Sequence, residues 1–515
     1  MNSVPLGLLI GLAAMAGVGL GIPGVLLALL TTLGFLLLDA PDRIDRRQLA
    51  TVTGVVVVVA AFAALRGQPS PPVADPRLAS ATTVTGVVRS MPSPGARFDT
   101  ALFQVETATL ADGSTVPLSV PVLASVPVSL RANVGDRLEL GGEFTALDGL
   151  EPGYRRYVEG RQAAGVFIGY GATLLDPGSS PARMLVTVRR DLTDRLRGAI
   201  PGDPGALAAG IVTGDDSALD DDTSDAFQTA GLSHVTAVSG QNIAMLAGLM
   251  TLLLRGRAVR RAIIVHVVTL ALIWSYVGMT GFGAPALRAG LFATFAFAAS
   301  RFGRKPDFLT ILALVSGGML LANPSYVSSV SFWLSMAASA ALVTAFGDPP
   351  VGVREWGMRA VGALVTAQLA TVPIAIAVFG TWSLGSIPAN LIVGPLMQVA
   401  FPLCFLLAGC LVVVPFVAPL VALAAELPLA MAVATAKAVA SAFPRMELAA
   451  GGTFVVMAAA VPCCVMIAVL SEDARRWWAR VESSVRQDEG ATMAAIAGLL
   501  VGSAAAILVM EGLLH

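Results

Sequence analysis

The sequence predicts a mainly α-helical, polytopic membrane protein that carries one small extracytoplasmic β domain. Of its 515 residues, 56% are hydrophobic and only 13% are charged, and the mean hydropathy is +0.77. This composition is typical of chains that cross a membrane repeatedly. The long apolar segments give way to short alternating ones between about residues 80 and 175, which predicts a separate sheet domain there.

The first 67 residues are predicted to form N-terminal transmembrane helices. The apolar block 4–38 is interrupted by Gly-Ile-Pro-Gly at 21–24, and Pro breaks the helical hydrogen-bond ladder, so two short helices are expected. The block lacks the basic start of a signal peptide. Three arginines place the loop 39–48 in the cytoplasm, so segment 50–65 leads outward.

Residues 68–180 are predicted to fold into an extracytoplasmic β-barrel of the OB type, after a Pro-rich linker. Five strands bounded by turn residues suit such a barrel. Its charge argues against a general nucleic-acid groove, because 8 arginines face 11 acidic residues between Asp75 and Asp176. The expected strands are Thr82–Val88, Ala101–Ala108, Thr115–Ala124, Arg137–Phe144 and Ala163–Leu175.

Residues 181–232 are predicted to form linker helices at the outer interface. Apolar residues recur at helical spacing between Pro181 and Ile200, with five arginines on the other face, which indicates an amphipathic helix on the membrane surface. Two short helices follow at 204–213 and 223–230. The acidic loop between them matches no calcium-binding spacing, so a solvated loop is expected.

Residues 233–515 are predicted to form the transmembrane core, which brings the total to about eleven spanning or re-entrant segments. Arginine-bearing loops alternate with apolar segments and fall consistently on one side. Prolines at 388, 395 and 402 predict that the stretch 386–416 is broken or re-entrant. The segment 418–442 is expected to lie along the outer interface.

The stretch Gly231–Met245, which reads GLSHVTAVSGQNIAM, places polar residues inside a membrane-length apolar segment. Ser233 is positioned to cap the start of a helix, and His234 is interpreted as a hydrogen-bonded structural residue. Amides within a bilayer need partners or water. The polar residues are therefore either interhelical hydrogen-bonding groups or part of the lining of a conduit. They are Ser239, Gly240, Gln241 and Asn242.

Arg288 and Asn390 complete the set of candidate channel-lining residues. Arg288 lies about one turn into a predicted spanning segment, where a charged residue is costly and usually faces the protein interior or an aqueous cavity. It is expected either to contact phosphate along a conduit or to snorkel to the interface or pair with an acid. Asn390, beside Pro388, is either a path residue at a broken helix or an interhelical hydrogen-bonding group.

Several separated motifs resemble one family. The chain has GIVTGDD at 210–216, the stretch Phe227–Gly240, Gly281-Phe282 with Leu287-Arg288-Ala289, Asn323-Pro324 with Phe332-Trp333-Leu334-Ser335, and Pro373 followed by Phe379-Gly380, Asn390 and Pro395. Their order resembles the ComEC family, the inner-membrane DNA-uptake proteins of competent bacteria. Family members usually have leucine and histidine where this chain has Gln241 and Asn242.

The resemblance implies a channel in the bacterial inner membrane that translocates single-stranded DNA into the cytoplasm during natural transformation. It assigns structural roles to Ser233, His234, Pro324, Pro373 and Pro395, and an OB-like domain before the core. Single-stranded DNA and membrane lipid are the expected partners. A separate nuclease is expected to act with the channel, because the metallo-β-lactamase-type domain of many relatives is not expected in this chain. A DNA receptor and a cytoplasmic helicase-like motor are the other expected partners, since the motive force must come from elsewhere.

No catalytic site, metal or cofactor is predicted, and the chain is not expected to be an enzyme. Three scattered histidines cannot build a two-metal nuclease centre. No phosphate-binding P-loop and no serine-hydrolase elbow occur. The alternative function is a secondary transporter of a small anionic or lipid-linked substrate, which broken helices and midplane amides would also suit. An intramembrane hydrolase would need a carboxylate pair or nucleophile that the spanning segments lack.

Overall fold

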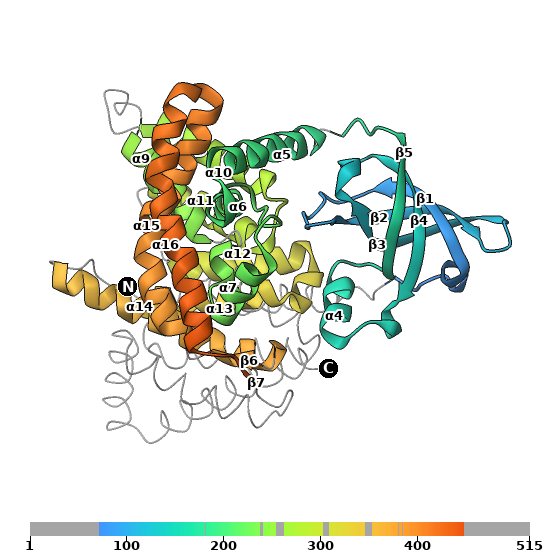
Figure 1. Ribbon diagram of the computed structural model, residues 1–515. Coiled ribbons are helices and arrows are strands. Elements are labelled where there is room, and N and C mark those ends of the chain that lie inside the picture. The colour runs from blue at the N-terminus through green and yellow to red at the C-terminus, as the bar shows by residue number, and fades with distance from the viewer. Residues whose placement is uncertain are drawn as a thin grey trace, which may run out of the picture. The chain divides into compact units, whose positions relative to one another are not determined.

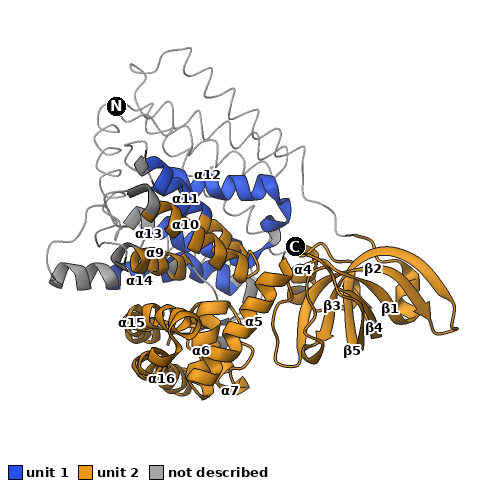
Figure 2. Cartoon of the chain, turned by 90° about the horizontal axis from the view of Figure 1, so that it is seen from above, with its two compact units in different colours: residues 1–69, 291–382, 446–515 blue, residues 70–290, 383–445 orange. Residues whose placement is uncertain are grey.

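The computed structural model describes residues 72–180, 182–236, 240–253, 262–301, 308–345, 353–379, 381–383 and 385–447 (Figure 1). Two compact units make up the chain (Figure 2). One comprises residues 70–290 and 383–445, and the other comprises residues 1–69, 291–382 and 446–515. The predicted transmembrane segments within 1–67, 452–470 and 492–510 lie outside the described residues.

A five-stranded sheet follows the linker, as predicted for this region. The strands pair in the order β1-β2-β3-β5-β4, and β4 pairs back to β1, so the sheet closes. All pairs are antiparallel except β3 with β5. Alternate residues such as Phe103 and Val105 point into a shared apolar core. The strands are β1 Ala81–Val88, β2 Phe98–Leu110, β3 Thr115–Pro127, β4 Arg137–Ala146 and β5 Gly165–Asp176.

Helix α4, Pro152–Gly160, connects β4 to β5 and was not predicted. Its sequence is short and mostly polar, so it carries little periodic signal. Pro152 near the helix start is compatible with a first turn, where its missing N–H costs nothing. One buried side chain, Val158, packs against Leu123 and Val166 of the sheet. Short 3-10 turns complete the domain: η1 Pro76–Ser80, η2 Val128–Leu130 and η3 Leu147–Gly149.

The same unit continues into a helical bundle built around one apolar cluster, which includes Leu207, Phe227, Val393 and Leu429. Helix α11 begins in this unit and ends in the other. The helices are α5 Ala182–Ala199, α6 Gly202–Thr213, α7 Asp221–Thr229, α8 Ser233–Thr236, α9 Gly240–Leu253, α10 Ala262–Met279, α11 Ala284–Arg301, α15 Ser386–Val413 and α16 Ala418–Ala442, with η6 Pro415–Val417 between the last two.

Helix α15 is continuous from Ser386 to Val413, so the predicted break in 386–416 is wrong. Pro388 lies in the first turn, where backbone N–H groups have no intrahelical partner in any case. Pro395 and Pro402 lie inside the helix. Prolines are tolerated there in membrane helices, because local adjustment and neighbouring groups satisfy the freed carbonyls. Helices α15 and α16 run side by side as a hairpin (Figure 1).

Two helical segments in the described part of the chain are long and apolar enough to cross a membrane, Ser386–Val413 and Pro415–Ala442. Five shorter apolar helices accompany them: Val265–Met279, Ala284–Ala299, Thr310–Ala322, Val330–Leu342 and Val361–Ile376. The expected total of about eleven segments therefore stays a prediction. So does the placement of 418–442 along the outer interface, since its length also allows it to span.

The unit of residues 1–69, 291–382 and 446–515 contains the end of α11 and six further elements, which include the predicted Asn-Pro motif. Asn323 caps a 3-10 turn by accepting a hydrogen bond from the backbone of Ser325 at 3.1 Å. Trp333 Nε1 donates to the Val327 carbonyl at 2.7 Å. The elements are α12 Phe308–Ala322, η5 Pro324–Ser328, α13 Val330–Ala345 and α14 Val353–Phe379, and β6 Thr381–Trp382 pairs with β7 Met446–Glu447.

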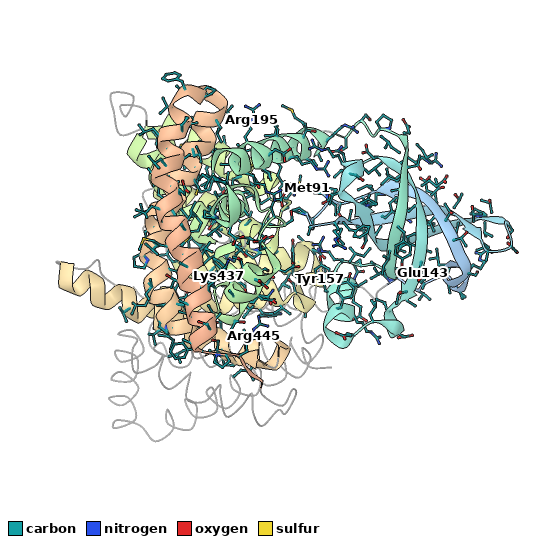
Figure 3. All side chains as sticks on the ribbon, viewed as in Figure 1. Met91, Glu143, Tyr157, Arg195, Lys437 and Arg445 are labelled. Carbon is teal, nitrogen blue, oxygen red and sulfur yellow. The ribbon has the colours of Figure 1, made fainter. Side chains whose placement is uncertain are left out.

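Polar contacts hold the ends of α6, α7 and α16 together within the unit of residues 70–290 and 383–445. Lys437 Nζ lies 3.1 Å from a carboxylate oxygen of Asp203, at the start of α6. Arg445 donates to the Asp225 carbonyl at 3.2 Å, and Figure 3 shows both cations along α16 and just beyond it. Burial raises the pKa of Asp203, but hydrogen bonds from Thr223, the Asp220 backbone and Lys437 outweigh it, and the net pKa is below its usual value.

The Asp203 contacts predict a pH-dependent contribution to stability. A carboxyl with a depressed pKa stabilises the fold above its unfolded pKa, and the contribution is lost as the pH falls through the folded value. We expect Asp203→Asn to lower the free energy of unfolding by about 1–2 kcal/mol at pH 7 and by less below pH ~4. Denaturation of the detergent-solubilised chain at both pH values measures this. The exposed Asp222→Asn is the control, and equal costs at both pH values would contradict the account.

Candidate functional site

The corner between α7 and α9 packs against the start of α15. Gly231 has a φ of 67°, and a Cβ added to it would lie 2.6 Å from the Cβ of Ser386. Both the left-handed conformation and the close approach require glycine. Asn390 donates to the carbonyls of Ser386 at 2.8 Å and of Gly231 at 3.5 Å. His234 hydrogen bonds to the Gly231 backbone and to the Asn390 side chain.

Asn242 joins three helices at the end of α6. Its side chain is 0% exposed, and its Nδ2 donates to the Ile211 carbonyl at 3.3 Å and to the Tyr276 hydroxyl at 3.0 Å. Tyr276 in turn donates to the same carbonyl at 2.8 Å. The last carbonyls of a helix lack intrahelical donors, so α9 and α10 supply them here. Asn242 thus acts as an interhelical hydrogen-bonding residue. Because its side chain is fully buried, it does not line an open channel in this conformation.

Gly240 and Arg288 lie against one another at the starts of α9 and α11. A Cβ added to Gly240 would lie 3.2 Å from Nη2 of Arg288 and 3.5 Å from the Cβ of Ala289. Arg288 is only 7% exposed. Its guanidinium therefore lies inside the bundle and does not snorkel to an exposed surface, which removes one of the two structural alternatives considered from the sequence.

The GIVTGDD motif at 210–216 forms the junction beneath this corner. A Cβ added to Gly210 would lie 3.1 Å from the Thr236 carbonyl, and Gly214 ends α6 in a left-handed conformation. The Thr213 hydroxyl bonds to that of Thr193 on α5 at 2.8 Å. The first half of the motif therefore packs α5, α6 and α8 against one another.

Both aspartates of the motif have partners, so the expected solvated loop is wrong at this end. Asp215 is buried and accepts from Arg197 at 2.9 Å and from the Ser217 hydroxyl at 2.6 Å. Burial raises the pKa of Asp216, and a hydrogen bond with the Thr236 side chain only partly opposes this. No group of three or more potential metal ligands occurs among the described residues.

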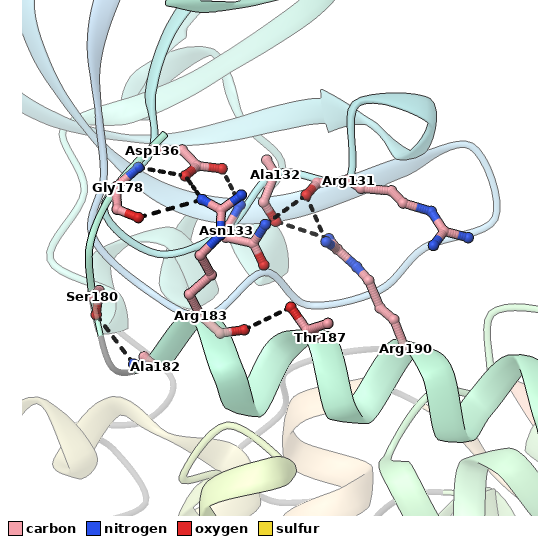
Figure 4. Close-up of polar contacts among 10 residues, drawn as sticks. All are labelled: Arg131, Ala132, Asn133, Asp136, Gly178, Ser180, Ala182, Arg183, Thr187 and Arg190. Carbon is pink, nitrogen blue, oxygen red and sulfur yellow. Dashed lines mark hydrogen bonds and ion pairs between the residues drawn. The ribbon is translucent and has the colours of Figure 1, made fainter. Parts of the chain in front are cut away.

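Helix α5 fastens the barrel to the bundle through its arginines (Figure 4). Arg183 lies 2.6 Å from Asp136, which also accepts from the backbones of Asn133 and Gly178. Arg190 lies 2.9 Å from Asp99 and donates to the carbonyls of the turn before β4. These side chains serve intramolecular contacts, and the predicted placement of α5 on a membrane surface stays a prediction.

A second contact joins the barrel to the bundle at the loop between β1 and β2. A Cβ added to Gly281 would lie 3.5 Å from Sδ of Met91 in this loop, and Figure 3 labels Met91 at this point. Gly281 has a φ of 78°, so the predicted Gly-Phe motif turns the chain between α10 and α11 and receives the barrel loop. Arg189 Nη2 donates to the Pro92 carbonyl of the same loop at 2.6 Å.

The remaining predicted residues are distributed over both units. Ser239 and the side chain of Gln241 lie outside the described part of the structure. Ser233 begins α8, and its carbonyl accepts from the Thr236 hydroxyl at 3.2 Å. Pro324 begins η5 after the Asn323 cap. Pro373 is buried inside α14, and Pro395 is exposed inside α15.

The structure places Gly240, Asn242, Arg288 and Asn390 in one unit, and their role as channel-lining residues stays a prediction. It also adds Tyr276, Ser386 and Ile211, which sequence reasoning missed. Tyr276 stands alone in an apolar run, and a buried tyrosine hydroxyl usually needs a partner. The lone tyrosine hydroxyl in the sequence could therefore have predicted a buried hydrogen bond at this position. The carbonyl of Ile211 has no sequence signal, because any residue at that position provides one.

A model of the Competence protein family matches residues 211–474, just over half of the chain. The chain belongs to this family. The match begins within the GIVTGDD motif and includes all the later motifs, so the predicted membership of the ComEC family is confirmed. This is a family of membrane proteins, in agreement with the apolar helices.

The chain is similar to ComE operon protein 3 of Bacillus subtilis (strain 168), with 27% identity over 231 residues. The similar region covers 44% of this chain and 29% of the relative. The chain therefore matches less than a third of that protein's length. No solved structure matches the chain.

The contacts of Asn242 predict a non-additive effect on stability. We expect Asn242→Leu and Tyr276→Phe each to lower the free energy of unfolding by about 1–3 kcal/mol, because each removes a buried donor. The cost of the double variant should differ from the sum of the two, since the Ile211 carbonyl loses both side-chain donors only there, whereas the bond between Asn242 and Tyr276 is already lost in either single variant. Denaturation in mild detergent measures this. The exposed Gln398→Leu on α15 is the control, and strict additivity would contradict the shared-carbonyl account.

Proposed function

We propose that this protein is a channel in the bacterial inner membrane that conducts single-stranded DNA into the cytoplasm during natural transformation. The observation that carries the proposal is the Competence family match over 211–474, which coincides with the region where glycines, amides and an arginine are concentrated inside apolar helices. A DNA strand is a polyanion, so its path needs cationic and hydrogen-bonding groups that a purely apolar interior lacks.

Arg288 is the residue we assign to strand contact. Its guanidinium lies inside the bundle and packs against Gly240, where a Cβ would come within 3.2 Å of Nη2. An arginine fork matches phosphate oxygens. Because Arg288 is buried in this state, conduction requires the helices around it to separate.

Asn390 and Asn242 hold this arrangement from both sides of the corner. Asn390 binds carbonyls on either side of the Gly231–Ser386 contact, and Asn242 binds the end of α6. Their role in the proposal is to fix the helices next to Arg288 and Gly240. Asn390 and Asn242 are therefore proposed to be positioning residues. The candidates for contact with the strand are Ser239, Gln241 and Arg288.

We further propose that the barrel is OB-like and extracytoplasmic, and that the chain crosses the membrane many times, with about eleven segments in all. The closed order β1-β2-β3-β5-β4 supports the first point. Conduction and not catalysis is the proposed activity. A nuclease, a DNA receptor and a helicase-like motor are the proposed separate partners. The transporter alternative loses one of its two supports, because α15 is an unbroken helix, and the amides inside apolar helices still suit it.

The proposal predicts that Arg288 matters for uptake more than for folding. We expect Arg288→Gln to reduce uptake of a labelled DNA strand into competent cells by about tenfold, as loss of a hydrogen bond to a charged group would, while Arg288→Lys retains part of it. Immunoblots of membranes check that variant and wild type accumulate equally. The exposed Arg155→Gln is the control. Unchanged uptake in the Arg288→Gln variant, or in cells that lack the gene, would contradict the proposal.

A further inference from the structure

A cavity of about 80 Å³ lies between the barrel and helix α5. Its walls come from the loop after β1, the turn before β4, one face of α5 and the loop after α6. This volume exceeds what one water molecule occupies, ~30 Å³. The cavity can therefore hold a small group of several heavy atoms, and it is separate from the Arg288 site.

The charges that line this cavity are unbalanced. Its three carboxylates are each paired with one arginine: Asp99 with Arg190 at 2.9 Å, Asp215 with Arg197 at 2.9 Å, and Asp194 with Arg131 at 3.2 Å. The fourth arginine, Arg189, takes part in no ion pair that the structure shows among its described residues. The four arginines and three aspartates of the lining therefore carry a net charge of +1.

Arg189 is held deep in the wall of the cavity. It is 4% exposed, and its Nη2 is fixed by the Pro92 carbonyl at 2.6 Å. Its Nε is buried and has no acceptor within the described part of the chain, and the same holds for Nε of Arg197. Burying a charged group without full compensation is costly. Burial also lowers the pKa of Arg189, which nearby Asp215 and Asp99 only partly oppose.

We propose that this cavity binds one phosphate group of the incoming single strand, with Arg189 as its principal ligand. The inference rests on the proposed function and deepens it by adding a contact point outside the helical core. Arginine presents a planar set of N–H donors that matches the oxygens of a phosphate. A tetrahedral oxyanion supplies both the missing negative charge and acceptors for the unused N–H groups.

The site also explains how an acidic barrel domain can meet a polyanion. The barrel carries 8 arginines against 11 acidic residues between Asp75 and Asp176, so its surface as a whole does not attract DNA. Helix α5 adds five arginines and two aspartates, and its arginines offset the barrel carboxylates Asp99 and Asp136. The local excess of positive charge lies at the junction between domain and bundle.

Equilibrium binding to the purified full-length chain tests the inference, with a short fluorescent thymidine oligomer and inorganic phosphate as separate probes. We expect Arg189→Gln to raise the Kd for the oligomer by about 10-fold or more, as for loss of a hydrogen bond between charged groups. The slope of log K against log salt should fall by ~0.7, the value for one phosphate contact on a single strand. Inorganic phosphate should compete with the oligomer in the wild type and not in the variant.

Two matched variants keep the test decisive if Arg189→Gln folds poorly. Arg189→Lys retains the charge and can still reach the Pro92 carbonyl, so it should bind more tightly than Arg189→Gln and more weakly than the wild type. Arg195→Gln removes an exposed arginine of the same helix, paired with Asp191 and outside the cavity, and should bind like the wild type. Equal losses in Arg189→Gln and Arg195→Gln would overturn the assignment.

The outcomes separate this inference from the proposed function. Oligomer binding that depends on Arg189 supports the inference even if cells that lack the gene still take up DNA, which would contradict only the proposed function. Oligomer binding that ignores Arg189, while uptake requires the gene, overturns only the inference. Binding of inorganic phosphate with no binding of the oligomer marks a small-anion site and overturns the assignment to the strand.

Discussion

The Ile211 carbonyl, at the end of α6, is the point on which the arrangement of the helical unit depends. Ile211 is 0% exposed, and a buried carbonyl without a partner costs about 1–3 kcal/mol. Asn242 of α9 and Tyr276 of α10 both donate to it. This shared acceptor fixes the start of α9 and the end of α10 relative to α6, and it thereby places Gly240 beside Arg288.

The need of buried polar groups for partners also explains how the barrel is attached to the helical bundle, where the groups are charged. Asp99 and Asp136 are buried carboxylates of the sheet domain, and such groups need cationic or hydrogen-bonding partners. Helix α5 supplies them through Arg190 and Arg183. The helix therefore satisfies buried charges of one domain while its apolar residues Val186 and Leu196 pack inward. Arg189 is the exception, and its incomplete compensation is what points to a ligand.

The sequence predicted the elements well wherever one periodic signal dominated. All five strands and helices α5 and α6 lie within a few residues of their predicted ranges, because alternation and helical spacing each leave a clear pattern. The predicted break in 386–416 is wrong, because proline interrupts soluble helices but is tolerated inside membrane helices such as α15. Contacts such as Asn242 with the Ile211 carbonyl are beyond sequence reasoning, since they depend on which helix ends meet in space.

Photo-crosslinking of a translocating strand tests the central claim, that the Gly240–Arg288 contact lies on the path of DNA. A photo-crosslinking residue would replace Ala289, next to Arg288, or the exposed Leu427 on α16, and a labelled strand would be arrested during uptake. The account predicts that the strand crosslinks at position 289 and not at position 427. Crosslinking at 427 with none at 289 would contradict it.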